Sequence, residues 1–431
     1  MNHFDQRDGD LWCEGVSVTA LARAVGTPFY LYSSATFERH YRVFREALDS
    51  FPRLASPLIA YAVKANSNLS VLATLGRMGA GADTVSEGEI RRAMAAGIPA
   101  SRIVYSGVGK TAAELAFALE VGVNQINVES EPELALLSTL ARARGARPGV
   151  VFRVNPDVGA GGHAKISTGT RESKFGVSLA EAERLYALAA ADSHIEALGV
   201  GCHIGSQITD MAPLAQAFGL MRDLVERLRA AGLSVTRLDL GGGLGVPYFN
   251  QPDPPTPADF AAMADAVVGG LDIELAFEPG RVIAANAGVM ISSVIHIHQR
   301  PEGRRFLVLD AAMNDLIRPA MYDAYHDIRP VAPRPGTPHL HDVVGPVCET
   351  GDTFTRDRLL PPLESGDLVA FMSAGAYGAV MSSEYNSRPL IPEVLVHGQE
   401  WAVVRPRPTY EEMLSREPAA PWLSSSITAA T

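Results

Sequence analysis

Cysteine is scarce in this sequence. Only Cys13, Cys202 and Cys348 occur among 431 residues, and no two of them form a C-x-x-C pair. An odd number of cysteines at wide spacing argues against a disulfide framework and against a cysteine-bound zinc site. Such a chain suits a reducing compartment, and we expect it to be cytoplasmic.

Long apolar runs and an excess of positive charge are also missing. No uncharged stretch is long enough to span a bilayer, and the first ten residues, MNHFDQRDGD, are too charged for a secretory leader. The formal net charge is −11, whereas proteins that bind nucleic acid usually carry a basic surface. We therefore expect neither membrane nor nucleic acid as a partner.

The chain does contain a regular alternation of short apolar runs and amphipathic patterns. The runs predict eight strands, at 58–64, 81–86, 102–107, 125–130, 150–156, 197–206, 237–243 and 273–280. Helical spacing fills most of the intervals, as in 86–97 and 180–191. Repeated strand–helix units imply parallel strands, and eight of them predict a closed (β/α)₈ barrel. An open doubly wound sheet is the alternative.

The alternation stops near residue 283. Strand-like runs separated by Pro- and Gly-rich turns follow, among them VMISSVIHIH and DLVAFMSAGAY. We expect a barrel domain over 33–283 and a β-rich domain, resembling a sandwich or small barrel, built from 1–32 and 284–431. The short N-terminal run PFYLYS is expected to join this second domain.

Several apparent motifs do not survive inspection. SGVGKT (106–111) resembles a phosphate loop, but Val104 stands where that motif requires its first glycine, and GGGLGV (241–246) lacks the last glycine of G-x-G-x-x-G. The pairs His296/His298 and His339/His341 are expected to lie on β-strands, and we do not predict a metal site.

Polar residues and glycines recur where the predicted barrel strands end. Active sites of such barrels are built from the C-terminal ends of the strands. The residues concerned are Lys64, Asp83, Arg153, His203, Ser206, Gly241, Gly242, Gly243, Glu278 and Arg281.

Lys64 is the most unusual of these residues, because it ends the apolar run LIAYAVK. An apolar site disfavours the charged form of a lysine, and a neutral amine can attack a carbonyl to form a Schiff base. The alternative is a structural lysine paired with an acid such as Asp83.

The glycines after strand seven and the EPGR turn after strand eight lie where (β/α)₈ barrels habitually bind phosphate. A lysine facing an anion cradle would suit a phosphorylated carbonyl compound, and pyridoxal 5′-phosphate (PLP) is the obvious one. Glu278 would then keep the pyridine nitrogen protonated, His203 could lie against the ring, and Ser206 could bond the phosphate. The alternative is that the glycines serve only as turns and that Glu278 and Arg281 only pair with each other.

With these residues in place, the chain resembles the PLP-dependent decarboxylases that share an alanine-racemase-like barrel and a β-domain. Within that group it is most similar to the diaminopimelate decarboxylases. The resemblance runs nearly end to end. Its motifs are YAVKAN, SKFG, HIGSQ, LDLGGGLGVPY, EPGR, LIRPAMY, CETGD and GAYGAVMSSEYNSRP.

The resemblance implies a role for each motif residue. Lys64 would carry the covalent link to the cofactor, His203 would stack on its ring, and Glu278 would face its ring nitrogen. The other residues implied in cofactor binding are Asp83, Arg153, Ser206, Gly242, Gly243, Gly280, Arg281 and Tyr377. Those implied in substrate binding are Arg281, Arg318, Tyr322, Glu349 and Tyr377.

The resemblance also implies an obligate homodimer with shared active sites. The CETGD loop would reach into the neighbouring subunit's site, where Cys348 would join Lys64 and His203 as a catalytic residue and return a proton to the substrate carbon. The β-rich domain would thus contribute to both the active site and the dimer interface.

The substrate implied is meso-2,6-diaminopimelate, which would yield L-lysine and carbon dioxide, the last step of lysine biosynthesis. Its far end carries a carboxylate and an ammonium, which Arg318 with Tyr322 and Glu349 would bind respectively. A buried Arg318 would reject ornithine or lysine, because its charge would be left unpaired. The alternatives are a decarboxylase of another basic amino acid or of a carboxylated polyamine, and a non-catalytic PLP-binding regulator.

Overall fold

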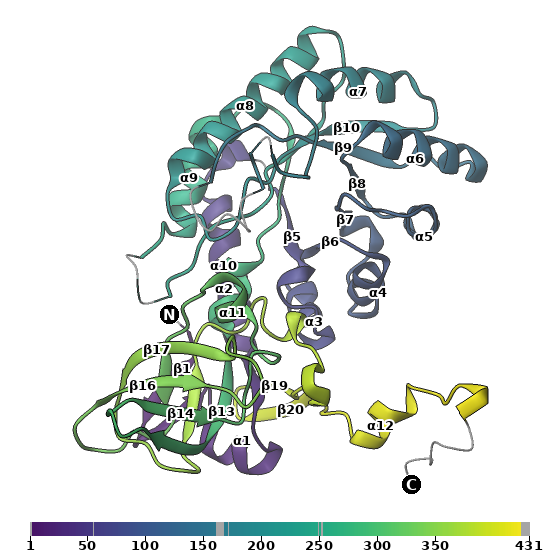
Figure 1. Ribbon diagram of the computed structural model, residues 1–431. Helices are drawn as coiled ribbons and strands as arrows, with labels where there is room; N and C mark the ends of the chain where they lie inside the picture. The colour runs from purple at the N-terminus through teal and green to yellow at the C-terminus, as the bar shows by residue number, and fades with distance from the viewer. Residues whose placement is uncertain are drawn as a thin grey trace. The chain divides into compact units, whose positions relative to one another are not determined.

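A computed structural model describes residues 2–54, 56–160, 168–170, 172–248, 250 and 253–423. The chain divides into two compact units. Ser34–Ala287 is called here the barrel unit, and Met1–Ser33 with Gly288–Thr431 is called the β unit (Figure 1).

The barrel unit contains the eight predicted strands. Each pairs in parallel with the next, and the sheet closes in the order β10-β11-β12-β5-β6-β7-β8-β9. The strands are β5 (Leu58–Ala62), β6 (Gly81–Thr84), β7 (Ile103–Tyr105), β8 (Gln125–Val128), β9 (Gly149–Arg153), β10 (Glu196–Gly201), β11 (Arg237–Asp239) and β12 (Glu274–Phe277). The closed (β/α)₈ barrel is confirmed, and the open sheet is excluded.

Helices surround the strands, as Figure 1 shows. They are α2 (Ser34–Asp49), α3 (Leu69–Arg77), α4 (Glu87–Ala95), α5 (Ala112–Val121), α6 (Glu131–Arg144), α7 (Leu179–Ala191), α8 (Met211–Ala230), α9 (Pro257–Val268) and α10 (Arg281–Ala284). Both helical patterns singled out in the sequence form helices, α4 and α7. Each begins after a serine whose side chain accepts a backbone N–H of the first turn, Ser86 for α4 and Ser178 for α7.

Aromatic rings fill part of the space between the strands and this outer layer. The Phe260 ring lies 5.6 Å from that of Phe277 on β12, 5.8 Å from Phe44 on α2 and 6.1 Å from Phe218 on α8. The contacts of Phe260 with Phe277 and Phe218 are edge-on, an arrangement that is favourable for aromatic pairs. Since Phe260 lies on α9 (Pro257–Val268), these rings pack α2, α8 and α9 together beside β12.

The β unit is built on a nine-stranded mixed sheet. Its strands are β4 (Phe29–Ser33), β13 (Gly288–Gln299), β14 (Arg305–Leu309), β15 (Ile328–Pro330), β16 (His339–Val344), β17 (Thr353–Leu360), β18 (Leu368–Phe371), β19 (Glu393–His397) and β20 (Glu400–Arg405). As predicted, the PFYLYS run joins it, because β4 pairs with both β13 and β19. The core contains Phe29, Leu31, Val289 and Ile291.

Smaller elements complete the β unit and the loops. A three-stranded sheet consists of β1 (Phe4–Arg7), β2 (Asp10–Cys13) and β3 (Val16–Ser17), and the helices are α1 (Val18–Val25), α11 (Arg318–Tyr322) and α12 (Tyr410–Ser415). Single 3₁₀ turns lie at Pro52–Leu54, Val63–Ala65, Ala100–Arg102, Ala285–Ala287, Ala379–Met381, Tyr385–Ser387 and Pro421–Leu423.

Two further observations bear on the expected absences. Neither unit has a described helix with the length and apolar character needed to cross a bilayer. The two His-x-His pairs lie on β13 and β16, and within the described ranges no three His, Cys, Asp or Glu side chains are grouped so that they could hold a metal ion.

Candidate functional site

A cavity of about 400 Å³ lies where the barrel strands end. Lys64, Arg153, His203 and Glu278 all line it, and they come from the ends of four different strands. Four of the predicted site residues are therefore brought to one place, at the C-terminal side of the barrel, where enzymes of this fold carry out their chemistry.

Lys64 lies just past the predicted strand. β5 ends at Ala62, two residues earlier than predicted, and Lys64 belongs to the 3₁₀ turn Val63–Ala65. Its side chain is 35% exposed, so it is not buried in the sheet as the apolar run suggested, but lies at the cavity. Because β5 ends at Ala62, Lys64 belongs to the turn at the cavity and not to the strand.

Asp83 on β6 is the ion-pair partner of the Lys64 ammonium. The Asp83 side chain is fully buried, and its second oxygen, Oδ1, has no hydrogen-bond partner among the described residues. The structural pairing considered for Lys64 is thus present. It coexists with the cavity, and a buried acceptor without a donor is suited to binding a further polar group.

Glu278 and Asp239 are buried carboxyl groups beside the cavity. Burial, followed by the charges of Asp239 and Asp83, raises the pKa of Glu278 well above its ordinary value. Burial also raises the pKa of Asp239, although Asp239 accepts hydrogen bonds from Gln125 Nε2 at 2.8 Å and from Gly241 N at 3.0 Å. A protonated base placed against Glu278 would stabilise its ionised form.

His203 follows β10 and is held as a neutral ring. Burial, and then the charges of Arg153 and Lys64, lower the pKa of His203 well below its usual range. Its Nδ1 accepts a hydrogen bond from Gly242 N at 3.2 Å, so the ring proton is assigned to Nε2. A neutral imidazole fixed in this way can lie flat against an aromatic ring without adding charge.

The glycine turn after β11 allows a close approach of backbones. A Cβ atom at Gly242 would lie 2.3 Å from Glu278 O, and one at Gly243, whose φ is +112°, would lie 2.7 Å from Gly205 O. The amides of Gly241 and Gly242 already donate to Asp239 Oδ1 and His203 Nδ1. The tight turn therefore orients two site residues as well as making room.

Arg281, Ser206 and Tyr248 form a polar cluster in the barrel unit. Arg281 donates to Ser206 Oγ through Nε at 3.2 Å and Nη2 at 3.0 Å, and its Nη1 donates to Tyr248 OH at 2.7 Å. Gly280 precedes α10, the short helix that begins with Arg281. Arg281 does not pair with Glu278 in any described contact, so the alternative that these two residues only pair with each other is wrong. A guanidinium beside two hydroxyl groups is suited to binding an anion.

The remaining predicted site residues belong to the β unit. Arg318 begins α11, is 6% exposed, and donates through Nη1 to His326 Nε2 at 2.8 Å, while His326 Nδ1 lies 2.9 Å from Met372 O as the donor. Tyr322 ends the same helix. Tyr377 has a φ of +55°, a rare conformation for an aromatic residue that is typical of functional sites.

Cys348 and Glu349 lie on the loop between β16 and β17, and both are exposed. Cys348 N donates to Asn386 Oδ1 at 3.2 Å, and the phenol of Tyr385 bonds to Glu349, which raises the pKa of Tyr385. Asp352 anchors the loop, because its carboxylate accepts Met313 N at 2.7 Å and Val347 N at 2.6 Å.

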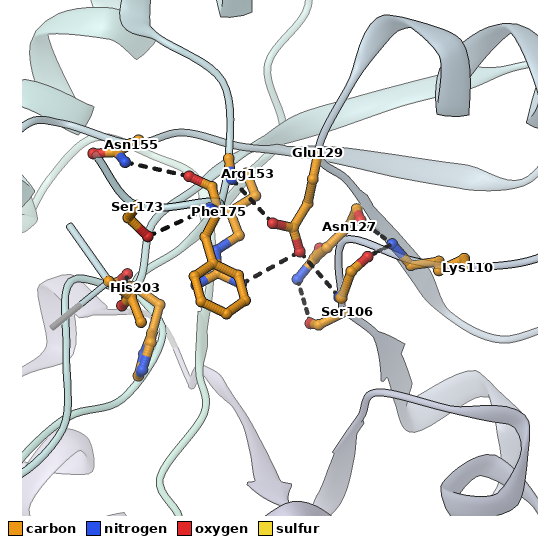
Figure 2. A network of polar contacts seen from close by, with 12 residues as sticks. Ser106, Lys110, Asn127, Glu129, Arg153, Asn155, Ser173, Phe175 and His203 are labelled. Carbon is orange, nitrogen blue, oxygen red and sulfur yellow. Dashed lines mark hydrogen bonds and ion pairs between the residues drawn. The ribbon is translucent and has the colours of Figure 1, made fainter. Parts of the chain in front are cut away.

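Two groups of residues near the cavity were not predicted. Asn127 donates to Ser106 Oγ at 2.9 Å and to Glu278 Oε1 at 3.4 Å. Glu129, directly after β8, is the acceptor of a further set of contacts (Figure 2). The available signal was an acid in a predicted strand, since Glu129 lies in the predicted strand 125–130 as Asp83 lies in 81–86.

The SKFG motif is described in the structure. Phe175 lines the cavity, and the Arg153 guanidinium lies 4.6 Å from its ring centroid. The whole segment 155–176 is long and glycine-rich, which makes it a candidate lid, but 161–167 and residue 171 lie outside the described residues.

Comparison with known proteins agrees with this geometry. Residues 34–285 match the family model described as the pyridoxal binding domain of pyridoxal-dependent decarboxylases. A diaminopimelate decarboxylase of Pseudomonas aeruginosa is 48% identical, over 98% of this chain and 100% of that protein. A crystal structure of the Helicobacter pylori enzyme of that name with L-lysine has a TM-score of 0.88 at 40% identity, covering 93% of this chain and 98% of that one. Another, from M. jannaschii in complex with L-lysine, has a TM-score of 0.93 at 34% identity, covering 98% and 100%. The chain therefore belongs to the pyridoxal-dependent decarboxylases, and within them to the diaminopimelate decarboxylases.

Proposed function

We propose that this protein binds pyridoxal 5′-phosphate and decarboxylates meso-2,6-diaminopimelate to L-lysine and carbon dioxide. The observation that carries the proposal is the cavity at which an amine, a neutral imidazole and a buried carboxyl group meet, Lys64, His203 and Glu278. Relatives of this family with L-lysine bound support the product.

The residues around the cavity fit this cofactor. Lys64 would supply the amine that joins its aldehyde, His203 would hold the ring, and Glu278 would hold the ring nitrogen, where a protonated base would offset the cost of a buried carboxylate. The remaining holders proposed are Asp83, Arg153, Ser206, Gly242, Gly243, Gly280, Arg281 and Tyr377. Arg281 with Ser206 is the charged part of the proposed phosphate site.

When bound, pyridoxal phosphate supplies an electron sink for the negative charge that remains on the substrate carbon after carbon dioxide leaves. The C–C bond to the carboxylate breaks, and the thiol of Cys348 gives that carbon a proton, so that the product carries hydrogen where the carboxylate was. Neutral His203 adds no charge that would compete with this transfer.

The far end of the substrate is assigned mostly to side chains of the β unit. Arg318, with Tyr322 and Tyr377 of the same unit and Arg281 of the barrel unit, is proposed for the distal carboxylate, and Glu349 for the distal ammonium. Arg318 is suited to this task, because its side chain is buried and a planar guanidinium can bind a carboxylate through two N–H groups.

A direct assay tests the activity. Purified protein, pyridoxal phosphate and meso-diaminopimelate should yield L-lysine and carbon dioxide, while L-ornithine and L-lysine should be poor substrates in parallel reactions. Turnover of L-ornithine in preference to diaminopimelate would contradict the assigned substrate, and uptake of the cofactor without any carbon dioxide would point to a non-catalytic role.

A cytoplasmic homodimer with shared sites is part of the proposal, with the Cys348 loop of each subunit completing the site of the other. Inactive Lys64→Ala and Cys348→Ala proteins should regain about a quarter of wild-type activity when their subunits are mixed, because half of the random pairs carry one intact site of two. No recovery from demonstrably exchanged subunits would show that each subunit works with its own loop.

A further inference from the structure

Glu129 lies immediately after β8, and its side chain is 2% exposed. Its carboxylate accepts three hydrogen bonds from three separate segments of the barrel unit. Oε1 accepts Gly107 N at 3.0 Å and Arg153 Nη1 at 3.3 Å, and Oε2 accepts Gly176 N at 3.0 Å. Figure 2 shows this carboxylate between Arg153 on one side and Ser106 and Lys110 on the other.

Two of the three donors, Gly107 and Arg153, line the cavity, and the third, Gly176, directly follows Phe175, which also lines it. Phe175 is fixed in turn, because its ring lies against the Arg153 guanidinium and its carbonyl accepts Asn155 Nδ2 at 3.3 Å. One buried carboxylate therefore holds the loop after β7, the arginine at the end of β9 and the SKFG segment together.

Glu129 is itself held by a buried ion pair. Its backbone N–H donates to Glu133 Oε2 at 2.9 Å, and Glu133 Oε1 accepts Lys110 Nζ at 2.6 Å. The side chains of Lys110 and Glu133 are 1% and 8% exposed.

Lys110 also donates to Gly107 O and to Asn127 O, both at 2.6 Å. The peptide units around Gly107 are thus fixed through its N–H by Glu129 and through its carbonyl by Lys110. The lysine of SGVGKT, which resembles a phosphate loop, therefore has a structural role, since it holds the loop around Gly107 in place.

We infer that Glu129 is a positioning residue for cofactor binding, which sets Arg153 and Phe175 in the cavity wall and is itself fixed through Lys110 and Glu133. This inference rests on the proposed binding of pyridoxal phosphate. The physical reason is that Arg153 is nearly buried, so its orientation depends on a charged acceptor, and a carboxylate has enough lone pairs for three donors.

Glu129→Gln tests the inference, because it keeps the shape but replaces one acceptor oxygen with an NH₂ donor that faces existing N–H donors. The dissociation constant of pyridoxal phosphate is measured by titrating cofactor-stripped protein and following the absorbance of the bound cofactor. We expect the constant to rise about 10- to 100-fold, as for the loss of a hydrogen bond to a charged group. Lys110→Met should shift it in the same direction by a smaller factor.

Glu131→Gln is the matched control. Glu131 lies two residues away, but it is half exposed and pairs with Arg184 at 2.6 Å on the outside of the barrel, so its loss should leave the constant unchanged. Thermal unfolding of the stripped proteins is measured in parallel. A lower melting temperature with an unchanged dissociation constant would assign Glu129 a purely structural role and overturn the inference, whereas failure of the wild type to take up cofactor would overturn the proposed function instead.

Discussion

In the barrel unit, Lys64, Arg153 and Glu278 surround one cavity and are braced by buried partners, whereas in the β unit Cys348 and Glu349 are exposed on a loop. The barrel residues gain their geometry from the ends of adjacent strands. The loop residues gain theirs from local contacts such as Asp352 with Val347 N. The groups proposed to bind the cofactor are thus fixed in advance by buried partners, whereas the two groups proposed to meet the substrate lie on an exposed loop.

The largest expected loss of turnover comes from a substitution in the barrel unit. Lys64→Ala removes the amine proposed to join the cofactor, and turnover should fall by at least about 10³-fold, a loss of the size that one positioned catalytic side chain contributes. The absorbance of covalently joined cofactor should disappear as well. Persistence of that absorbance in the variant would exclude Lys64 as the point of attachment.

Cys348→Ala should affect turnover without affecting cofactor binding. Without the thiol, turnover should fall about 10²- to 10³-fold, the range for a positioned acid, while the dissociation constant of the cofactor stays within twofold. Cys13→Ala, in the core of the same unit, serves as the control for loss of a thiol and should leave turnover intact. Equal losses of binding and turnover in Cys348→Ala would contradict its assignment as a proton donor.

Arg318→Lys tests the proposed recognition of the distal carboxylate. A lysine keeps the charge but loses the planar pair of N–H donors, so kcat/KM for diaminopimelate should fall about 30-fold or more. Arg329→Lys is a suitable control, because Arg329 lies on β15 with its side chain 44% exposed and pairs with Asp327. A similar loss in both variants would argue that a general effect on folding, and not recognition of the carboxylate, is responsible.

The smallest effect is a pH dependence of stability. Burial raises the pKa of Glu89 from 4.5 to about 7. The folded state therefore binds this proton more tightly than the unfolded state does. The contribution of this group to the free energy of unfolding is complete below pH 4.5 and is lost as the pH rises through about 7. Glu89→Gln, which still accepts Val85 N, should remove this loss and raise the melting temperature at pH 8 by about 3 °C.

Asp315 provides the same test in the β unit. Burial raises its pKa to about 6, and the charges of Arg388 and Arg407 partly oppose that rise. Asp315→Asn should therefore raise the melting temperature at pH 8 by less than Glu89→Gln does. If either variant melted at a lower temperature than the wild type at pH 8 and at the same temperature at pH 4, the ionised carboxylate would stabilise the fold. That result would contradict the prediction.

Much of the barrel could be predicted because its pattern is local. Each strand is a short apolar run followed by a polar residue. The run predicts the strand, and the polar residue after it is predicted to lie at the cavity. The exact ends could not be predicted in this way, since the predicted strand 58–64 includes Val63 and Lys64, which instead belong to a 3₁₀ turn.

The bracing network could not be predicted in this way. Glu129 meets Gly107, Arg153 and Gly176, which lie 22 to 47 residues away along the chain, and only the closed barrel brings them together. The same limit applies to the internal use of the Gly241 and Gly242 amides. In the β unit, helix α12 was missed although Thr409 and Glu412 form a capping box, because its six residues are too few for a clear period.

The position of β4 in the large sheet has a consequence for biosynthesis. This strand ends at Ser33, and its neighbours β13 and β19 begin at Gly288 and Glu393, so the whole barrel is an insertion within the β unit. During translation the FYLYS strand emerges long before either partner, with both of its hydrogen-bonding edges open. This segment is prone to aggregation and stays unpaired until the last third of the chain has been synthesised. The barrel, which follows it in the sequence, can fold before then.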